Sequence, residues 1–423
     1  MKGIDIMKQR SLNFIMILTI LFINCFVLTS CSSYGGSKEP GDYGGLGYAG
    51  GEFGETFPDT NPDEGNNSQI VIKPGQLTAC AYDDNEHFSF WKSLVSQYAQ
   101  TNESNGLFQN YYEMFEFKTY NRLVIKVPTN VDAKIHLVDD QKNVLATSIP
   151  NANGIAYLYP TVARSVYNIC LEYVKTGETE ITTQYEEIQG DTEFVIDGET
   201  FKNDVIQLMF VIDTTGSMGD EINYLKSEVN DIISQVKQEF ANSTIELAIM
   251  LYRDLHDQYV TKYSDFNTDI VAQQSFLSVQ YADGGGDFPE AVDTAMLEAA
   301  SKQWSEKAKT KILVHVADAP AHDSLVNKWA TATNILASKG VRIITVASSG
   351  IDKKTEYFFR SQCMITGGKY VYLTDDSGIG NSHLDATVEV QPTVEYLNSC
   401  LVRLIKGYHT GTFEEPIYYG QEQ

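Results

Sequence analysis

One apolar run, followed at once by a polar cluster, constrains this chain more than any other feature. The run covers residues 205–212 and reads as a strand buried on both faces, which is typical of the middle of a parallel sheet. The cluster directly after it is Asp213-Thr214-Thr215-Gly216-Ser217. In open α/β sheets, ligands bind in the crevice outside the carboxyl ends of the strands. Because carboxylate and hydroxyl oxygens are the ligands that Mg²⁺, Ca²⁺ and Mn²⁺ prefer, the cluster predicts a divalent-cation site.

Strand patterns alternate with helix patterns from residue 201 onward. We expect strands at 205–212, 245–251, 311–317, 341–347 and 370–373, with a short edge strand at 259–264. Apolar residues every three or four positions from Ile222 to Phe240 predict a helix, and a last helix is expected near 394–404. This alternation predicts an α/β doubly wound, Rossmann-like, mostly parallel sheet over residues 200–410, followed by a tail at 411–423.

Two further acidic loops belong to this predicted domain. One is Gly284-Gly285-Gly286-Asp287-Phe288-Pro289-Glu290, and the other begins at Asp318, directly after the strand at 311–317. If this strand lies beside the strand at 205–212, Asp213 and Asp318 emerge side by side at one sheet edge. The expected metal ligands are Asp213, Thr215, Ser217, Asp287 and Asp318. Asp254 is expected either as an outer partner of the metal or, equally, in a pair with Arg253 or another local group.

The same residues also have a purely structural interpretation. Asp287, Pro289 and Glu290 together have the form of a capping box at a helix start. Ser217 and Asp220 would make a similar cap for the helix that follows. A carboxylate has two oxygens, so capping and metal ligation are compatible.

These motifs, in this order, resemble the von Willebrand factor A domain and its metal-ion-dependent adhesion site. Asp213, Thr215 and Ser217 match the family's Asp-x-Ser-x-Ser motif, and Asp318 matches its final Asp. The loop that carries a Thr in the family offers Asp287 here. The motifs Asp-Thr-Thr-Gly-Ser-Met, Tyr-Arg-Asp at 252–254 and Gly-Gly-Gly-Asp-x-Pro-Glu resemble the subgroup found beside α-kinases and in bacterial secreted proteins.

The resemblance implies a bound Mg²⁺, or Ca²⁺ or Mn²⁺, and a protein or peptide ligand that reaches the cation through a carboxylate. The departure at Asp287 adds a negative charge beside the metal. We therefore expect stronger cation binding and weaker attraction for an incoming carboxylate.

The N-terminal segment reads as a targeting signal. Residues 1–30 have a basic start at Lys8 and Arg10 and an apolar stretch at 14–27, which is short for a membrane span. The sequence Leu28-Thr29-Ser30-Cys31 resembles a bacterial lipobox, which implies cleavage before Cys31 and lipidation of that residue. An uncleaved anchor helix is the alternative, and both place the chain at the extracytoplasmic face of a membrane. Residues 31–67 are rich in Gly, Ser, Pro and acidic residues and predict a flexible spacer.

Short alternating runs separated by turn signals predict an all-β sandwich over residues 68–190. Residues 135–160 resemble the carboxypeptidase-regulatory-like sandwich of bacterial surface proteins. The many aromatic residues at 86–117 favour a core or domain-interface role over a carbohydrate-binding platform. Two alternatives stay open for the cysteines: four buried free thiols, or disulfides pairing Cys80 with Cys170 and Cys363 with Cys400.

The formal net charge of −25 argues against nucleic acid as a partner. The sequence contains no Gly-x-Ser-x-Gly elbow, no His-Glu-x-x-His helix and no Lys-bearing phosphate loop. His322 follows the Asp318 loop, where a turn into the next helix is a more ordinary role than acid–base chemistry. We therefore expect a binding protein and not an enzyme. The alternatives are a cell-envelope scaffold with a structural cation and, less favoured, a metal-dependent hydrolase.

Overall fold

The structure is a computed structural model that describes residues 72–96, 106–115, 118–200 and 202–420. The chain divides into two units, Met1–Ser68 and Gln69–Gln423, and all the described residues belong to the second. The predicted signal segment, the lipidation site at Cys31 and the spacer at 31–67 lie outside the described residues. Within the described ranges, every helix is too short or too polar to cross a bilayer.

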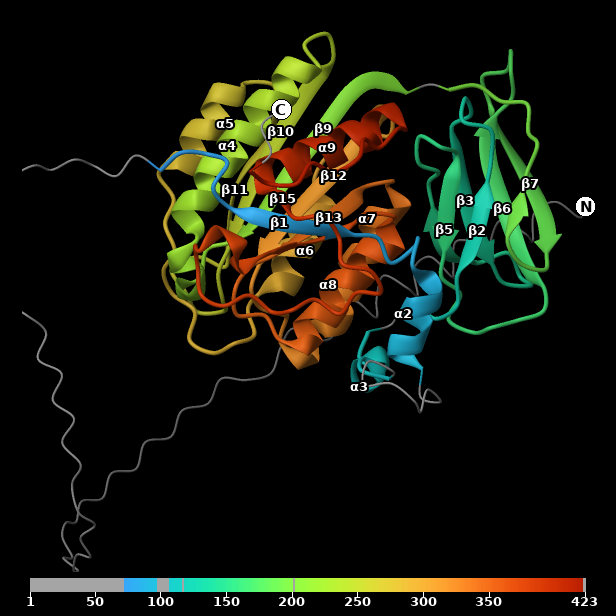
Figure 1. The fold of residues 1–423 in the computed structure, drawn as a ribbon. Coiled ribbons are helices and arrows are strands. Elements are labelled where there is room, and N and C mark those ends of the chain that lie inside the picture. The colour runs from blue at the N-terminus through green and yellow to red at the C-terminus, as the bar shows by residue number, and fades with distance from the viewer. Residues whose placement is uncertain (1–71, 97–105, 116–117, 201, 421–423) are drawn as a thin grey trace, which may run out of the picture. The chain divides into compact units, whose positions relative to one another are not determined.

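A mostly parallel sheet of eight strands forms the centre of this unit (Figure 1). Its order is β11 (Thr261–Asn267), β10 (Thr244–Tyr252), β9 (Asn203–Asp213), β12 (Ala308–Ala317), β13 (Arg342–Ala347), β14 (Tyr370–Leu373), β1 (Thr78–Tyr82) and β15 (Glu395–Tyr396). The five strands from β10 to β14 run parallel, and β11 pairs antiparallel at the edge. The predicted doubly wound sheet is therefore present, with its two longest strands, β9 and β12, side by side.

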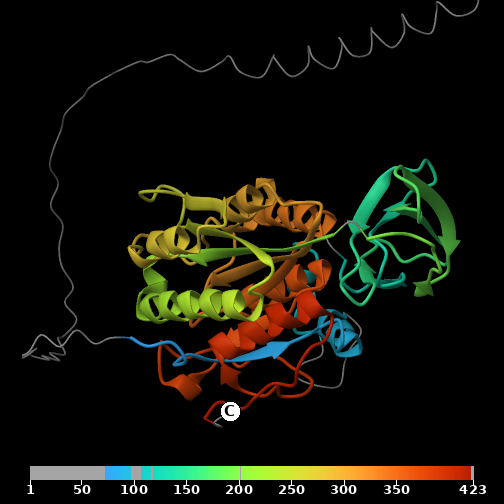
Figure 2. The same ribbon diagram turned by 90° about the horizontal axis from the view of Figure 1, so that it is seen from above.

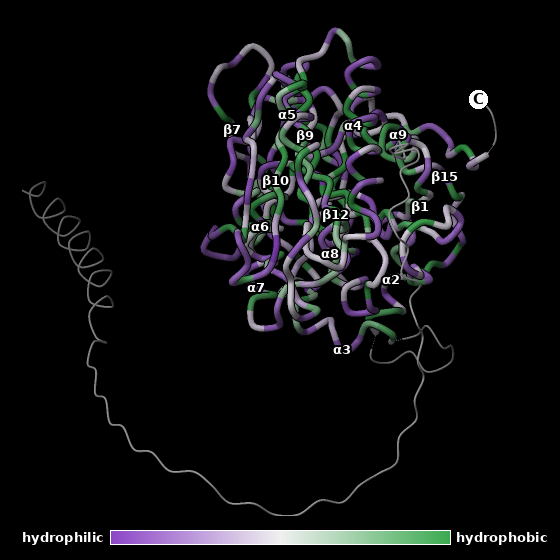
Figure 3. The backbone as a smooth tube through the Cα atoms, turned by 90° about the vertical axis from the view of Figure 1, so that its left-hand side faces the viewer, coloured by the Kyte–Doolittle hydropathy of each residue, from purple (hydrophilic) through white to green (hydrophobic). Residues whose placement is uncertain are grey.

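Helices cover both faces of the sheet, because successive side chains of each buried strand point to opposite faces. Leu208, Phe210 and Ile212 face a core shared with α4 (Ile222–Glu239), α5 (Ile270–Ser278) and α9 (Leu397–Thr410). Met209 and Val211 face the core shared with α6 (Val292–Ser301), α7 (Val326–Ser338) and α8 (Lys353–Thr366). Figure 2 shows α4 and α9 on one side of the sheet and α6 and α7 on the other. In Figure 3 the apolar segments follow β9, β10 and β12 through the interior.

The segment before the small β-sheets belongs to this layered body, which corrects the expected range of 68–190 for the sandwich. Strand β1 pairs antiparallel with β14 and β15, with Ala79 opposite Leu373. The helices α2 (Phe88–Val95) and α3 (Gln109–Tyr112) follow it, and Trp91 is fully buried in the core of α7 and α8. The described aromatic residues of this segment therefore belong to the core or pack against it, as the sequence predicts.

Residues 123–193 carry the short strands that the alternating pattern predicts. One sheet has the order β5 (Ile155–Leu158), β2 (Leu123–Lys126) and β8 (Thr192–Glu193), and the other has β4 (Val144–Ser148), β3 (Ala133–Val138), β6 (Tyr167–Val174) and β7 (Ile181–Ile188). Residues from both sheets, including Ile125, Ile135 and Leu171, share one apolar core. The likeness to the carboxypeptidase-regulatory-like sandwich stays a prediction.

The four described cysteines are buried free thiols. Of the two alternatives left open by the sequence, the structure has the one without disulfides. Cys80 lies in β1 and Cys170 in β6, which belong to different sheets.

Candidate metal centre

The polar cluster after β9 forms a compact turn around the Asp213 carboxylate. Oδ1 of Asp213 accepts hydrogen bonds from the backbone nitrogen of Thr215, at 2.9 Å, and from its hydroxyl, at 2.6 Å. The Thr215 hydroxyl lies 3.2 Å from the Ser217 hydroxyl. The other carboxylate oxygen, Oδ2 of Asp213, is buried and has no hydrogen-bond partner in the described part of the chain. The turn continues into a short 3₁₀ helix, Gly216–Asp220. Ser217 lies in its first turn and therefore remains close to the carboxyl end of β9.

Asp318 occupies the same edge, one strand away. The parallel pairing of β9 with β12 places Val316 opposite Ile212. The two strands therefore end side by side at the carboxyl edge of the sheet. Asp318 is buried, and its Oδ1 has no hydrogen-bond partner among the described residues. Ser217 hydrogen-bonds to this carboxylate. The structure therefore brings Asp213, Thr215, Ser217 and Asp318 together, as the sequence predicts.

The Gly-rich loop at 284–290 forms the third side of the candidate metal centre, beside the Asp213 turn and the Asp318 loop. The carbonyl of Gly284 accepts a hydrogen bond from the backbone nitrogen of Gly216 at 3.0 Å. Gly284 has a φ of +80°, and a Cβ atom there would lie 2.5 Å from the Asp257 carboxylate, so this close approach requires glycine. A cavity of about 440 Å³ opens between the loops, and its lining includes Ser217, Asp287 and Asp318.

The buried acid of this loop is Glu290, which the sequence interpretation treated as a cap. Its backbone nitrogen donates to the Pro320 carbonyl, and it forms a bridge with Ala321, so the loop is joined to the one that carries Asp318. Glu290 is 3% exposed, and its Oε2 lacks a hydrogen-bond partner within the described ranges. Asp287 also lines the cavity, but it is exposed to solvent.

The proposed caps do not form. The helix that follows the Gly-rich loop begins at Val292 behind Ala291, without a side-chain cap. Helix α4 begins behind Glu221, again without a side-chain cap. The polar side chains of both loops are therefore not needed to cap these helices.

Burial and mutual repulsion raise the pKa values of three carboxyl groups here. Burial raises the pKa of Asp213 to about 6, although the hydrogen bonds from Thr215 oppose the rise. Burial and then the Asp213 charge raise the pKa of Asp318 to about 8. Burial, with the charges of Asp213 and Asp254 next, raises the pKa of Glu290 to about 9. Each shift means that these acids are hard to ionise together unless a positive charge lies nearby.

Asp254, the expected outer partner, is buried at the end of the neighbouring β10. Its Oδ1 lies 2.8 Å from Nε2 of His322, and its backbone nitrogen donates to Asp257. The neighbouring Arg253 instead donates to the Thr214 carbonyl and lies 3.4 Å from the Asp283 carboxylate. Because the Asp254 charge contributes to the raised pKa of Glu290, it lies within electrostatic range of the centre.

A buried polar chain that the sequence analysis missed lies behind Asp213. Tyr252, at the end of β10, lies opposite Asp213 in the parallel pairing with β9, and its hydroxyl lies 3.1 Å from Nε2 of His315. Nδ1 of His315 lies 2.9 Å from Nε2 of Gln362. Burial lowers the pKa of His315 to about 3, so this histidine is neutral and adds no positive charge. Tyr252 is the first residue of the Tyr-Arg-Asp motif, but no sequence signal separates His315 and Gln362 from ordinary core residues, because each lies within a buried strand or helix.

The donor set fits a hard cation held partly by hydroxyls. In the described part of the chain, no group of three or more His, Cys, Asp or Glu side chains is close enough to form a metal cluster on its own. The centre instead combines the hydroxyls of Thr215 and Ser217 with the two unpartnered oxygens of Asp213 and Asp318. Buried carboxylate oxygens without a partner are costly, and a divalent cation would satisfy both.

Residues 207–378 match the family model described as von Willebrand factor A domain, which confirms the predicted A domain in this part of the chain. The alpha-protein kinase vwkA of Dictyostelium discoideum is 25% identical over 244 residues, which are 55% of this chain and 37% of that protein. The putative ariadne-like RING finger protein R811 of Acanthamoeba polyphaga mimivirus is 27% identical over 187 residues, which are 40% of this chain and 18% of that protein. The matches thus cover little more than a third of one relative and less than a fifth of the other.

Two solved structures are also similar to part of the chain. The conserved hypothetical protein BatB from Bacteroides thetaiotaomicron is 10% identical, with a TM-score of 0.33 over 48% of this chain and 98% of that one. An aerotolerance-related membrane protein from Bacteroides fragilis is 11% identical, with a TM-score of 0.32 over 49% of this chain and all of that one. TM-scores at this level support no further conclusion about function.

Proposed function

We propose that this chain binds a protein or peptide ligand through a divalent cation held at the candidate metal centre, and that it does so as a lipid-anchored protein on a cell surface. One observation carries the proposal. The buried oxygens Oδ2 of Asp213 and Oδ1 of Asp318 have no hydrogen-bond partner in the described ranges, and Asp318 lines a cavity together with Ser217. The match to the A-domain family over residues 207–378 supports the same conclusion.

The four proposed cation ligands differ in their access to the cavity. Thr215 and Ser217 would hold the cation through their hydroxyls, and Asp213 and Asp318 would hold it directly or through water. Asp213 and Thr215 are fully buried, whereas Ser217 and Asp318 line the cavity. When bound, Mg²⁺, Ca²⁺ or Mn²⁺ supplies positive charge and a coordination position for a ligand oxygen. That position would face the cavity, because the other sides are filled by protein.

The charge balance favours a second candidate function in which the cation is structural. Asp213, Asp318 and Glu290 are buried together, and Asp287 stands at the rim of the same cavity. Four carboxylates around one divalent cation leave net negative charge, which weakens attraction for a ligand carboxylate. In this alternative the chain is a cell-envelope scaffold that uses another surface. Chelation that lowers the melting temperature but leaves pull-down of a partner unchanged would favour it.

Titration of residues 69–423 with Mn²⁺ and Mg²⁺ in a calorimeter tests cation binding. We expect a binding heat from the wild type and none from Asp213→Ala, because Asp213 is fully buried at the base of the centre. The matched control is Asp265→Asn, which removes one carboxylate charge from an exposed position on the edge strand β11 and should keep the full heat. Equal heats from the wild type and Asp213→Ala would count against the proposal.

A second pair of variants separates the two acids of the Gly-rich loop. Glu290→Gln should weaken Mn²⁺ binding about tenfold or more, since glutamine has nearly the same volume but cannot ionise beside the cation, as Glu290 can once a cation offsets its raised pKa. Asp287→Asn should have the smaller effect, because water screens an exposed carboxylate. Mn²⁺ dissociation constants at one pH and one salt concentration check this order. The reverse order would indicate that Asp287 binds the cation and that Glu290 contributes little to the affinity.

A further inference from the structure

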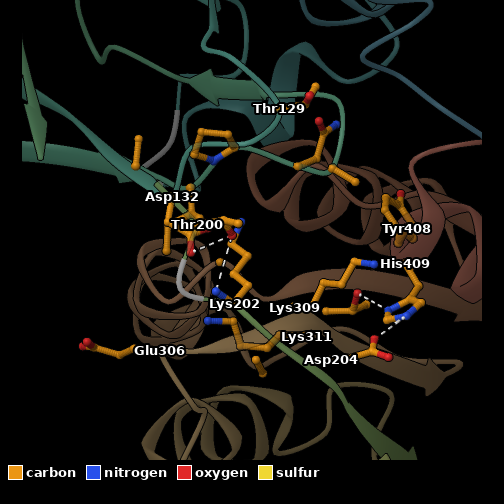
Figure 4. A pocket seen from close by; sticks show the side chains of 18 of the residues that line it. Thr129, Asp132, Thr200, Lys202, Asp204, Glu306, Lys309, Lys311, Tyr408 and His409 are labelled. Carbon is orange, nitrogen blue, oxygen red and sulfur yellow. Dashed lines mark hydrogen bonds and ion pairs between the residues drawn. The ribbon is translucent and has the colours of Figure 1, made fainter. Parts of the chain in front are cut away.

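A second and larger cavity, of about 930 Å³, lies at the amino ends of the parallel strands, opposite the carboxyl edge that carries the metal centre (Figure 4). The starts of β9, β12 and β13 and the ends of α4 and α9 form one side of it, and loops of the small sheets form the other. Lys311 lies near the start of β12, whereas Asp318 follows its end. At about 3.3 Å per residue, these two positions are roughly 23 Å apart. This cavity is therefore separate from the candidate metal centre.

Five basic side chains line this cavity, which we call the lysine pocket: Lys134, Lys202, Lys309, Lys311 and Arg342. Such a concentration is unusual in a chain with a formal net charge of −25. Five acidic side chains line it as well: Asp132, Glu172, Asp204, Glu239 and Glu306. The net charge of the lining is therefore uninformative, and the pairing of individual groups decides what the pocket can bind.

Each of the five carboxylates already has a partner. Asp132 pairs with Lys202 at 2.9 Å, and Glu306 lies 3.6 Å from Lys134. Of the other three, Glu239 pairs with Lys406. Asp204 and Glu172 lie 3.2 and 3.5 Å from His409 and His136, which carry positive charge only when protonated. Because burial lowers the pKa of His409, Asp204 keeps its charge within the lining.

Three cations of the pocket remain without a carboxylate in the described part of the chain: Lys309, Lys311 and Arg342. The pocket thus holds cations that are positioned by the fold but not neutralised by it. Arg342 donates only to a backbone carbonyl, that of Ile149, at 2.9 Å.

Lys311 is the most informative of the three. It is 7% exposed, so its ammonium group has lost most of its water, and the described residues offer it neither an ion pair nor a hydrogen bond. In Figure 4 its amino group points toward that of Lys202, on the same side of the pocket. Burial, with the charges of Lys202 and Arg342 next, lowers the pKa of Lys311 to about 8. A buried cation that faces other cations needs an anion for compensation.

The rest of the lining suits an organic group. Phe240 and Tyr408 contribute rings at the ends of α4 and α9, and the Phe240 ring packs edge-on against His409 at 4.6 Å. Ile149 and Pro150 contribute apolar surface from the loop after β4. Small-molecule sites typically combine apolar walls with a few convergent polar groups. The volume is also within the usual range for such sites.

We propose that the lysine pocket binds a small organic molecule through a phosphate group held by Lys311 and Arg342, two buried cations whose charges act on each other, with Lys309 farther along the same lining. A phosphate dianion fits better than a carboxylate, since it brings two charges to the two buried cations that have no carboxylate partner. Ammonium and guanidinium groups both bind phosphate oxygens by charge-assisted hydrogen bonds. The aromatic and aliphatic residues of the pocket would contact the organic part.

Calorimetric titration of residues 69–423 with phenyl phosphate, inorganic phosphate and benzoate, at constant pH and low salt, tests the proposal. We expect phenyl phosphate to bind more tightly than the other two, since only it offers both a dianion and a ring. Lys311→Gln should weaken phenyl phosphate binding about tenfold or more. Lys309→Gln, at an exposed position that the fold tolerates, should weaken it by a smaller factor. The latter variant keeps the test valid if Lys311→Gln fails to fold.

Two controls make the result specific. Lys307→Gln removes the same charge from an exposed side chain on the same approach to β12 but outside the lining, so it should bind as the wild type does. Asp213→Ala should also keep phenyl phosphate binding, so a failure at the metal centre is distinguishable from a failure here. Absence of binding by the wild type, equal affinity for benzoate, or wild-type affinity in both Lys311→Gln and Lys309→Gln would overturn the proposal.

Discussion

Arg360→Met should destabilise the protein by about 3–5 kcal/mol, the range measured when one partner of a buried ion pair is removed. The Arg360 guanidinium is fully buried in α8. Its Nε and Nη2 donate to the two oxygens of Asp84, at 2.9 and 2.6 Å, and its Nη1 donates to Glu356 at 2.9 Å. Without this guanidinium, Asp84 keeps a buried carboxylate with no cation. Glu356 keeps Lys353 as its cation and the backbone nitrogen of Thr387 as a hydrogen-bond donor.

The denaturant midpoint and the thermal midpoint of residues 69–423 measure this loss. Lys406→Met is the control, because Lys406 pairs with Glu239 and Glu414 at a partly exposed position. Pairs of this kind contribute about 0–1 kcal/mol. The double variant Asp84→Leu with Arg360→Met should be more stable than Arg360→Met alone, since it removes the orphaned carboxylate as well. If Arg360→Met and Lys406→Met lose the same stability, the network around Arg360 has no structural role.

The strand ends of the metal centre are predictable because they depend on a strong local signal. Long apolar runs such as residues 205–212 and 311–317 read as buried parallel strands, and neighbouring parallel strands deliver their next residues to one edge. Asp213 and Asp318 therefore meet as expected. The strand pattern fixes both positions without any knowledge of the loops between them.

The role of Glu290 could not be predicted from local sequence rules. The sequence Asp287-Phe288-Pro289-Glu290 satisfies a local capping rule, so local reasoning assigns Glu290 to a cap. Its actual role depends on a contact between the Gly-rich loop and Pro320, thirty residues away along the chain. Loop conformation of this kind is set by tertiary contacts, which periodicity does not encode.

Strand β1 was missed for a related reason. Its five residues, Thr-Ala-Cys-Ala-Tyr, have no strong alternation and are almost entirely buried. Its partner strand β14 lies nearly three hundred residues later, with Cys80 opposite Tyr372. Composition alone therefore grouped it with the short strands that follow it. The A-domain body extends beyond the expected boundaries at 200–410, because its sheet includes a strand from the start of the described chain.

Trp91→Ala should cost about 3–5 kcal/mol, as is usual for truncating a large buried aromatic residue. Trp91 is fully buried, stacks on Tyr357 of α8 at a centroid distance of 5.8 Å and donates from Nε1 to the Thr119 hydroxyl. Truncation leaves a large void in the core and an unpaired hydroxyl at Thr119. The control is Tyr120→Ala in the same part of the chain, where the side chain is 44% exposed and the expected change is about 0.5 kcal/mol or less.

The Trp91 variant tests whether the segment at 72–96 belongs to the A-domain body or to the small sheets. If the segment at 72–96 were only a linker to the small sheets, Trp91→Ala would leave the unfolding of the A-domain core unchanged. Because Trp91 packs against α8, we expect the mutation to lower the main unfolding transition, and to increase amide hydrogen exchange in α8 and in β14, the strand paired with β1. Unchanged exchange in these two elements, with a loss of stability confined to residues 123–193, would show that this segment belongs to the small sheets after all.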